Sequence, residues 1–264
     1  MELAHAFFLG VLEGCTEFLP ISSTGHLILA VDMLGLSTPP GRVFEIVIQF
    51  GAILAICALY FVKLWHVARD ALTGDAAAWH FIRNIALAFF PAVLIGVVAR
   101  EWIMATLFNP AIVAIALIIG GTAILLIEQL RPLPTIHDTE SMGWRMALVI
   151  GLIQCIAMIP GVSRSGATIM GARLIGMERK AAAEFSFFLA IPTMLGAASY
   201  QLYQTNAALS TSNMEMIAAG FFAAFFTALL VVHWALGFIS THGFAPFAYY
   251  RIALGSFILA VLYF

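Results

Sequence analysis

Runs of about twenty apolar residues recur along the chain and constrain its fold more than any other feature. A helix needs about that many residues to cross roughly 30 Å of hydrocarbon. Within each run the apolar residues are continuous rather than alternating, which predicts helices rather than strands. Six runs are long enough to span a membrane: about 43–63, 81–100, 110–130, 181–204, 214–239 and 246–264.

The composition places the whole chain in a membrane. It is 62% hydrophobic and only 10% charged, whereas a soluble domain carries about a quarter charged residues. The formal net charge of -2 argues against a nucleic-acid partner. We therefore predict one integral membrane domain over 1–264, with membrane lipid as its surroundings and no nucleic acid bound.

Two further apolar stretches are each broken by a polar motif. The first consists of residues 2–19 and about 24–36, and the second of residues 142–159 and 164 to about 176. Each piece is too short to span the hydrocarbon, so each pair predicts a helical hairpin that enters the membrane and returns to the same side. Such re-entrant backbone is tolerated only where protein or a wet cavity surrounds it.

The two hairpins and the spans after them form a repeat. A shift of 141 positions aligns glycines, hydroxyl residues and phenylalanines: Gly10 with Gly151, Ser22 with Ser163, Thr24 with Ser165, Gly25 with Gly166, and Phe44 with Phe185. We predict repeat 1 over about 2–130 and repeat 2 over about 142–264. Because three spans separate the hairpins, the second copy is inverted. The predicted fold is therefore all-α, with six transmembrane helices and two re-entrant hairpins in an inverted-topology repeat.

The basic residues predict the orientation. One face carries most of them: Lys63, Arg69, Arg83, Arg131, Arg145, Arg173, Arg179 and Lys180, against Arg42 and Arg100 on the other. By the positive-inside rule the first face is cytoplasmic. Both termini and the base of the first hairpin then lie outside.

The first motif runs from Glu13 to His26 and carries most of the candidate chemistry. Glu13 and Glu17 are four positions apart, so both carboxylates project from one helix face. Each costs about 2.5–3.5 kcal/mol inside an apolar helix, which predicts a divalent cation, Mg²⁺ or Ca²⁺, between them and an anion. Ser22, Ser23 or Thr24 can cap the next helix, and the free N–H groups and hydroxyls there predict a phosphate site.

His26 and Arg164 complete the candidate site, and each has a plainer alternative. His26 follows Ser23 by three positions and Ser22 by four, so it could take a proton from either hydroxyl. Alternatively it is a hydrogen-bonded interior histidine. Arg164 lies among further hydroxyl residues, which predicts a phosphate clamp built with Ser163, Ser165 and Thr168. Its alternative is a counterion for Glu13 or Glu17.

Two other pairs of residues leave choices open. Glu45 and Gln49 could support the metal or form a polar contact between helices. Gly10 and Gly14 predict close packing of helices, either within the chain or across a homodimer.

The quoted motifs resemble those of a known family. Glu13-Gly-Cys-Thr-Glu-Phe-Leu-Pro-Ile-Ser-Ser-Thr-Gly-His26 and Pro160-Gly-Val-Ser-Arg-Ser-Gly-Ala-Thr168 are similar to the signatures of bacterial undecaprenyl-diphosphate phosphatases of the BacA/UppP type. The resemblance continues through 44–51, 184–187 and 246–251. It implies hydrolysis of the C55 lipid diphosphate to the monophosphate at the periplasmic face of the inner membrane. It also implies recycling of the peptidoglycan lipid carrier, and bacitracin resistance when the enzyme is in excess.

The resemblance implies site roles as well. Glu13, Glu17, His26 and Arg164 match residues that the family requires for activity, and Ser23 matches a proposed nucleophile. The combined hypothesis is a metal-dependent phosphatase for a polyprenyl diphosphate whose two hairpin tips meet. Either Ser23 attacks phosphorus with His26 as base, or His26 activates water, or a phosphohistidine forms. The competing class is a transporter that flips a polyprenyl phosphate, because inverted repeats with broken helices are typical of transporters.

Overall fold

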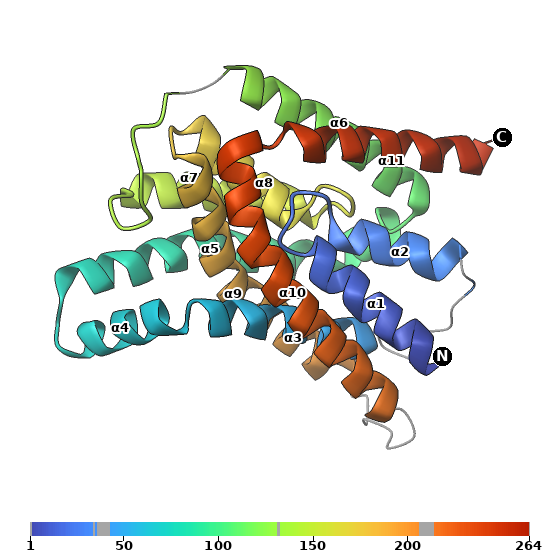
Figure 1. The fold of residues 1–264 in the computed structure, drawn as a ribbon, viewed down its shortest axis with the longest axis horizontal. Coiled ribbons are helices and arrows are strands. Elements are labelled where there is room, and N and C mark those ends of the chain that lie inside the picture. The colour runs from blue at the N-terminus through green and yellow to red at the C-terminus, as the bar shows by residue number, and fades with distance from the viewer. Residues whose placement is uncertain (1, 34, 36–42, 131–132, 206–213, 264) are drawn as a thin grey trace.

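Helices make up nearly all of the secondary structure in the part of the chain that the structure describes. This computed structural model describes residues 2–33, 35, 43–130, 133–205 and 214–263, which form eleven α-helices and one short 3-10 helix (Figure 1). The β-pairing recorded among these residues is a single parallel bridge between Ile136 and Met177. The predicted all-α class is confirmed. The loop at 36–41, Arg42 and Arg131 lie outside the described residues.

Among the described residues, five helices are long and apolar enough to cross a membrane. They are α5 (Ala76–Thr106), α6 (Pro110–Leu130), α9 (Arg179–Thr205), α10 (Met214–His242) and α11 (Ala245–Tyr263). A sixth span requires α3 (Val43–Leu59) and α4 (Phe61–Leu72) to be taken together, although they are bent by 73°. By helix length and composition the chain is a multi-pass membrane protein.

Helix α4 differs from the prediction. A span over 43–63 followed by a polar connection around 69–75 was expected, but the helix bends at Tyr60 and continues to Leu72. The segment contains Lys63, His66, Arg69 and Asp70 between apolar residues, so it resembles a polar loop when hydropathy is averaged. Its apolar side chains share one face instead, and this amphipathic pattern forms a helix.

Two pairs of shorter helices occupy the predicted hairpin positions. In the first hairpin α1 (Leu3–Thr16) is followed by a turn and then by α2 (Ser23–Met33). In the second hairpin α7 (Trp144–Gln154) and the 3-10 helix η2 (Cys155–Met158) precede α8 (Arg164–Leu174). Both breaks are confirmed, although α1 ends at Thr16, before Pro20, where it was expected to end.

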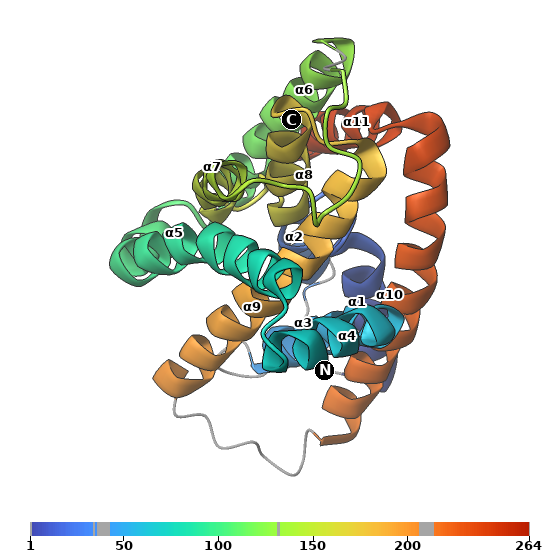
Figure 2. The same ribbon diagram turned by 90° about the vertical axis from the view of Figure 1, so that its left-hand side faces the viewer.

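The hairpins pack against helices from the other half of the chain. Helix α1 lies along α10, α7 lies along α5, and α6 lies beside α11 (Figures 1 and 2). A Cβ at Gly10 would overlap the Gly220 carbonyl oxygen, and one at Gly151 would lie 2.5 Å from the Ala88 carbonyl oxygen. The Gly10–Gly14 pair thus packs within the chain, and the homodimer stays a prediction.

Aromatic packing fixes the tip of the first hairpin against α9. Phe18, in the turn after α1, is fully buried and meets Phe187 edge-to-face with ring centroids 5.6 Å apart. Both rings belong to the largest buried apolar cluster, which is built largely around α9. Such pairs contribute about 0.5–1.5 kcal/mol beyond their buried area, so the turn that carries the polar motif is held rigidly.

Candidate active site

The two hairpin tips have the same unusual backbone. Ser22 and Ser163 have φ values of 71° and 77°, and no other described non-glycine residue has a positive φ. Each serine precedes the second helix of its hairpin, and its Oγ accepts a hydrogen bond from the N–H three residues later, at 3.4 Å from Gly25 and 3.0 Å from Gly166. Ser22 is therefore the cap of α2 among the three predicted candidates. A non-glycine residue in this conformation is strained, so the surrounding packing must hold both tips.

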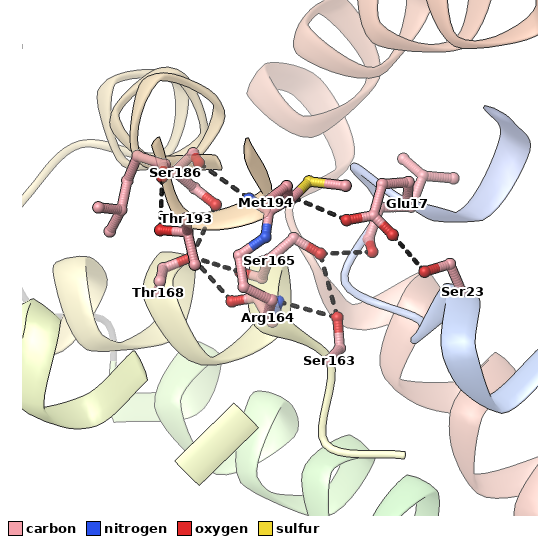
Figure 3. Close-up of polar contacts among 12 residues, drawn as sticks. Glu17, Ser23, Ser163, Arg164, Ser165, Thr168, Ser186, Thr193 and Met194 are labelled. Atoms are coloured by element: carbon pink, nitrogen blue, oxygen red, sulfur yellow. Dashed lines mark hydrogen bonds and ion pairs between the residues drawn. The ribbon is translucent and has the colours of Figure 1, made fainter. Parts of the chain in front are cut away.

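Side chains from the two tips meet in a buried ion pair. Arg164 Nη2 donates to Glu17 Oε1 at 3.0 Å, and the Ser23 hydroxyl donates to Glu17 Oε2 (Figure 3). Arg164 Nη1 also donates to the Ser186 carbonyl at 3.0 Å. The structure thus brings Glu17 and Ser23 from the first half of the chain together with Arg164 from the second half. Arg164 is a counterion for Glu17, as one of the two alternatives predicted.

The hydroxyl residues of the second tip bind the backbone and one another. Ser165 Oγ donates to the Leu19 carbonyl at 2.7 Å and lies 3.0 Å from Ser163 Oγ. Thr168 Oγ1 donates to the Arg164 carbonyl at 2.9 Å and lies 2.6 Å from Ser186 Oγ. Ser165 therefore ties the second tip to the first, and Thr168 ties α8 to α9.

A polar cavity opens between the tips. It has a volume of about 160 Å³ and is lined by Glu17, Ser22, Ser23, Thr24, Ser163 and Arg164, together with Gln49 from α3 and residues of α9. Ser165 and Thr168 are fully buried and are not among its lining residues. Four of the six predicted phosphate-contacting hydroxyl residues, including Ser23, thus line one small pocket beside the ion pair.

A larger apolar groove adjoins this cavity. It has a volume of about 510 Å³, runs between α5, η2 and α9, and includes Phe89, Val93, Val97 and Met158. It shares Ala157, Arg164, Thr193 and Ala197 with the polar cavity. A molecule with a small anionic head and a long apolar tail matches this combination.

His26 is held by two hydrogen bonds within the protein. Its Nδ1 is 2.7 Å from the Ser22 main-chain carbonyl, so that nitrogen carries the proton. Its Nε2 is 2.6 Å from the Tyr250 hydroxyl, with the two rings stacked at 4° between their planes. The structure shows the plainer alternative, a hydrogen-bonded interior histidine, because the Ser23 hydroxyl points to Glu17 and the His26 ring lies against the Ser22 carbonyl. The role of His26 in proton transfer stays a prediction.

Glu13 is the residue best suited to a cation. Both of its carboxylate oxygens are buried and have no hydrogen-bond partner, and it interacts electrostatically with Glu17, Glu45 and Arg164. Both Glu17 oxygens are already occupied by Ser23 and Arg164. No cluster of three or more histidine, cysteine or acidic side chains suited to a metal occurs in the described part of the chain. The residues fit a cation only if a bound diphosphate and water supply its other oxygens.

Sequence reasoning assigned no role to several residues around the site. Ser186 binds Arg164 and Thr168, Met194 Sδ lies 3.4 Å from Arg164 Nη2, and Tyr250 binds His26. Met194 looks ordinary in an apolar helix, so no signal marked it. Ser186 lies in the stretch 184–187 that resembles the family, but nothing in the sequence gave it a role. Arg251 did carry a signal, because an arginine inside an apolar span is costly and functional by default.

The fold and site define a class of protein. It is a multi-pass helical membrane protein in which two broken helices bring an acid–hydroxyl–guanidinium cluster to a buried pocket. The chain belongs to the family described as bacitracin resistance protein BacA, which it matches over residues 6–257.

Relatives match along nearly the whole chain. It is 56% identical over 255 residues to the "Undecaprenyl-diphosphatase" of Parvibaculum lavamentivorans, covering 97% of this chain and 95% of the relative. It is 54% identical over 260 residues to "Undecaprenyl-diphosphatase 2" of Paramagnetospirillum magneticum, covering 98% of each. It is 50% identical over 262 residues to "Undecaprenyl-diphosphatase 3" of Acinetobacter baylyi, covering 99% and 98%. The family resemblance of the motifs is thus confirmed.

Proposed function

We propose that this chain hydrolyses undecaprenyl diphosphate to undecaprenyl phosphate and inorganic phosphate. The relatives that match its full length carry that activity in their names. The observation that carries the proposal is the Ser23–Glu17–Arg164 chain at the wall of the polar cavity. The adjoining apolar groove suits a prenyl tail, and the cavity suits the diphosphate.

Ser23 is the proposed nucleophile, and Glu17 is its base. The Ser23 hydroxyl already donates to Glu17 Oε2, so its proton passes to that oxygen as Oγ bonds to the terminal phosphorus. The anhydride bond breaks and undecaprenyl phosphate leaves. The proton on Glu17 passes to the leaving phosphate. The freed carboxylate then takes a proton from the water that attacks the phosphoserine, and this proton goes to Ser23 Oγ as inorganic phosphate leaves. No step needs a reactant beyond substrate and water.

Arg164 stabilises the charge that develops on the phosphoryl oxygens. A protonated Glu17 holds a guanidinium more weakly than an ionised one, so proton transfer releases Arg164 towards the substrate. Arg164 Nε is buried without a partner in the structure and offers one more donor. Ser22, Thr24 and Ser163 line the same cavity and bind the remaining oxygens.

His26 belongs to an alternative route. It would activate water or accept the phosphoryl group, as the sequence analysis left open. Both ring nitrogens are engaged by Ser22 and Tyr250, so this route requires the ring to exchange partners. Trapping distinguishes the two: quenched wild-type enzyme should hold a radiolabelled phosphoserine that Ser23→Ala lacks. Wild-type turnover by Ser23→Ala would remove the covalent serine route.

A divalent cation, Mg²⁺ or Ca²⁺, is proposed beside Glu13. When bound, it would neutralise charge on the diphosphate oxygens. Glu13 would hold it through the two oxygens that lack partners, and Glu17 would complete the acidic wall. The acids are too few to bind the ion tightly alone, which predicts that cation and substrate bind together.

We also propose the re-entrant, inverted-repeat topology. It is supported by the strained serines at both hairpin tips and by the packing of each hairpin on helices of the other half of the chain.

The ion pairs of the basic residues support the orientation. Lys63 pairs with Glu140 at 2.5 Å, and Arg179 with Glu128 at 2.7 Å. The loop from 133 to 143 contacts the α8–α9 connection through Ile136 and Met177. These basic segments therefore gather at one end, which we assign to the cytoplasm. The termini and the pocket opening are assigned to the periplasmic face of a bacterial inner membrane.

The test is phosphate release by purified protein in detergent, where no membrane gradient exists. Wild-type protein should release inorganic phosphate from undecaprenyl diphosphate, lose activity with chelator and regain it with Mg²⁺ or Ca²⁺. Glu17→Ala should fall by about 10³-fold or more, in line with the loss of a general base. Glu215→Ala, at an exposed acid at the start of α10, is the matched control and should retain activity.

Each negative result has a separate meaning. Absence of phosphate release from wild type would contradict the hydrolase and favour a lipid transporter. Release that chelator leaves unchanged would remove the cation from the proposal while keeping the hydrolase. Full activity of Glu17→Ala would remove the acid–hydroxyl cluster as the reacting centre.

A further inference from the structure

Arg251 in α11 is a buried cation whose partners are all main-chain carbonyls. Its exposed fraction is 1%, and no acid side chain is among its described partners. Its guanidinium donates to four oxygens: Nη1 to Pro20 at 3.0 Å, Nη2 to Gly161 at 3.0 Å and Ala116 at 3.2 Å, and Nε to Leu117 at 3.4 Å. The mechanism above does not use this residue.

Two of the four acceptors lie at the tips of the two hairpins. Pro20 is in the turn between α1 and α2, and Gly161 is in the turn between η2 and α8. Carbonyls at helix breaks have no intrahelical partner, and at membrane depth no bulk water can replace one. A guanidinium has five donors in a planar fork and can satisfy several such carbonyls together. A lysine ammonium cannot span them.

Arg251 thus joins the tips through groups that are separate from the catalytic cluster. Its neighbour Tyr250 binds His26 on α2, so two consecutive residues of α11 hold the first hairpin. Arg251 also lies directly under α8, because a Cβ at Gly166 would be 3.0 Å from Nη1. Any displacement of the guanidinium therefore changes how Ser23 and Glu17 face Arg164.

We propose that Arg251 is a positioning residue for the phosphatase reaction, which holds the two hairpin tips in the alignment that catalysis requires. This inference rests on the proposed function. A positioning role differs from a purely structural one in its effect on variants. When Arg251 is altered, the protein should still fold and bind substrate but should turn it over more slowly. Misplacement by about 1 Å far from the reacting atoms can reduce rates by about 10²-fold.

Gly120 in α6 provides a way to move the guanidinium without removing its charge. A Cβ at Gly120 would overlap Arg251 Nη2 and lie 2.7 Å from its Cζ. Gly120→Ala must therefore push the guanidinium away from its carbonyl partners. Gly237 in α10 has no atom within 4 Å of an added Cβ, so Gly237→Ala is the matched control for a glycine-to-alanine change within a helix.

The experiment measures kcat and KM of monodisperse, folded protein in detergent with undecaprenyl diphosphate. Arg251→Lys and Gly120→Ala should each lower kcat by about 10²-fold, with KM within about threefold of wild type and Gly237→Ala unchanged. In the double variant Gly120→Ala/Arg251→Lys the loss should equal that of Arg251→Lys alone, because the added methyl group acts through the guanidinium that lysine lacks.

Two outcomes would overturn the proposal. One is an unchanged kcat per folded protein in both Arg251→Lys and Gly120→Ala. The other is a double variant whose losses multiply, which would mean that Gly120 acts independently of Arg251. Both are judged against an active wild type, whereas an inactive wild type would contradict the proposed function itself.

Discussion

The two hairpins share a backbone but differ in chemistry. Both have a serine at positive φ that caps the helix after the break, and both have a glycine pressed against a helix of the other half. At the positions aligned by a shift of 141, however, the side chains diverge. Glu13, Ser23 and His26 of the first hairpin correspond to Gln154, Arg164 and Ala167 of the second.

This difference shows how two hairpins with the same backbone conformation can build a site whose two sides carry different side chains. The backbone features place both tips, whereas the side chains place acids on one tip and the cation on the other. Neither hairpin alone has both the acid–hydroxyl pair and the guanidinium, and the ion pair forms only where they meet. Position and charge are thus set by different residues, and each can be perturbed separately.

A large effect, comparable to that of Glu17→Ala in the first hairpin, is expected from the cation of the second hairpin. Arg164→Lys keeps the charge but loses the fork that reaches Glu17 and the Ser186 carbonyl together. We expect kcat to fall by about 10³-fold, near the upper range for removal of a transition-state donor. Arg69→Lys, at an exposed arginine of α4, is the control for the same change. Activity of Arg164→Lys within tenfold of wild type would mean that charge alone suffices there.

Glu13, which corresponds to Gln154 in the second hairpin, should show a smaller effect on activity and an opposite effect on stability. Glu13→Gln replaces a buried acid that lies beside two other acids, Glu17 and Glu45, with a neutral amide of similar size, which removes the repulsion between like charges. We therefore expect activity to fall by about 10²-fold while the thermal unfolding temperature rises. A fall in both would contradict the view that Glu13 is kept for function at the expense of stability.

A stability effect alone should follow from the glycine contacts that the hairpins share. Gly10→Ala and Gly151→Ala each place a Cβ against a backbone carbonyl of the facing helix. Overpacking of this kind costs about 1–3 kcal/mol, so both should lower the unfolding temperature to a similar extent, with Gly237→Ala unchanged. Loss at only one position would show that the hairpins dock differently.

The sequence predicted those parts of the fold that depend on local features, namely continuous apolar runs and helix-breaking motifs. The run at 110–130 forms α6 with the expected bounds, and both hairpin breaks fall in the expected motifs. It failed at Phe61–Leu72, where polar residues interrupt an apolar helix face and average hydropathy conceals the helix.

The site was predictable in its residues but less so in its contacts. Glu17 was marked because a carboxylate is costly inside an apolar helix. Ser23 and Arg164 were marked by their places among hydroxyl residues at the two helix breaks and by the family resemblance. Which distant group each one meets depends on tertiary packing, so the role of Tyr250 as the partner of His26 had no local signal. For the same reason the sequence could not choose between the two alternatives for Arg164.

A double-mutant cycle on kcat is the most direct test that both hairpins build one reacting centre. It compares wild type, Glu17→Gln, Arg164→Lys and the double variant, with a radiolabelled substrate to follow slow turnover. Residues that act as one unit are strongly non-additive, so the double variant should be about as slow as the slower single variant. Losses that multiply would show that Glu17 and Arg164 act independently and would contradict a shared centre at the two tips.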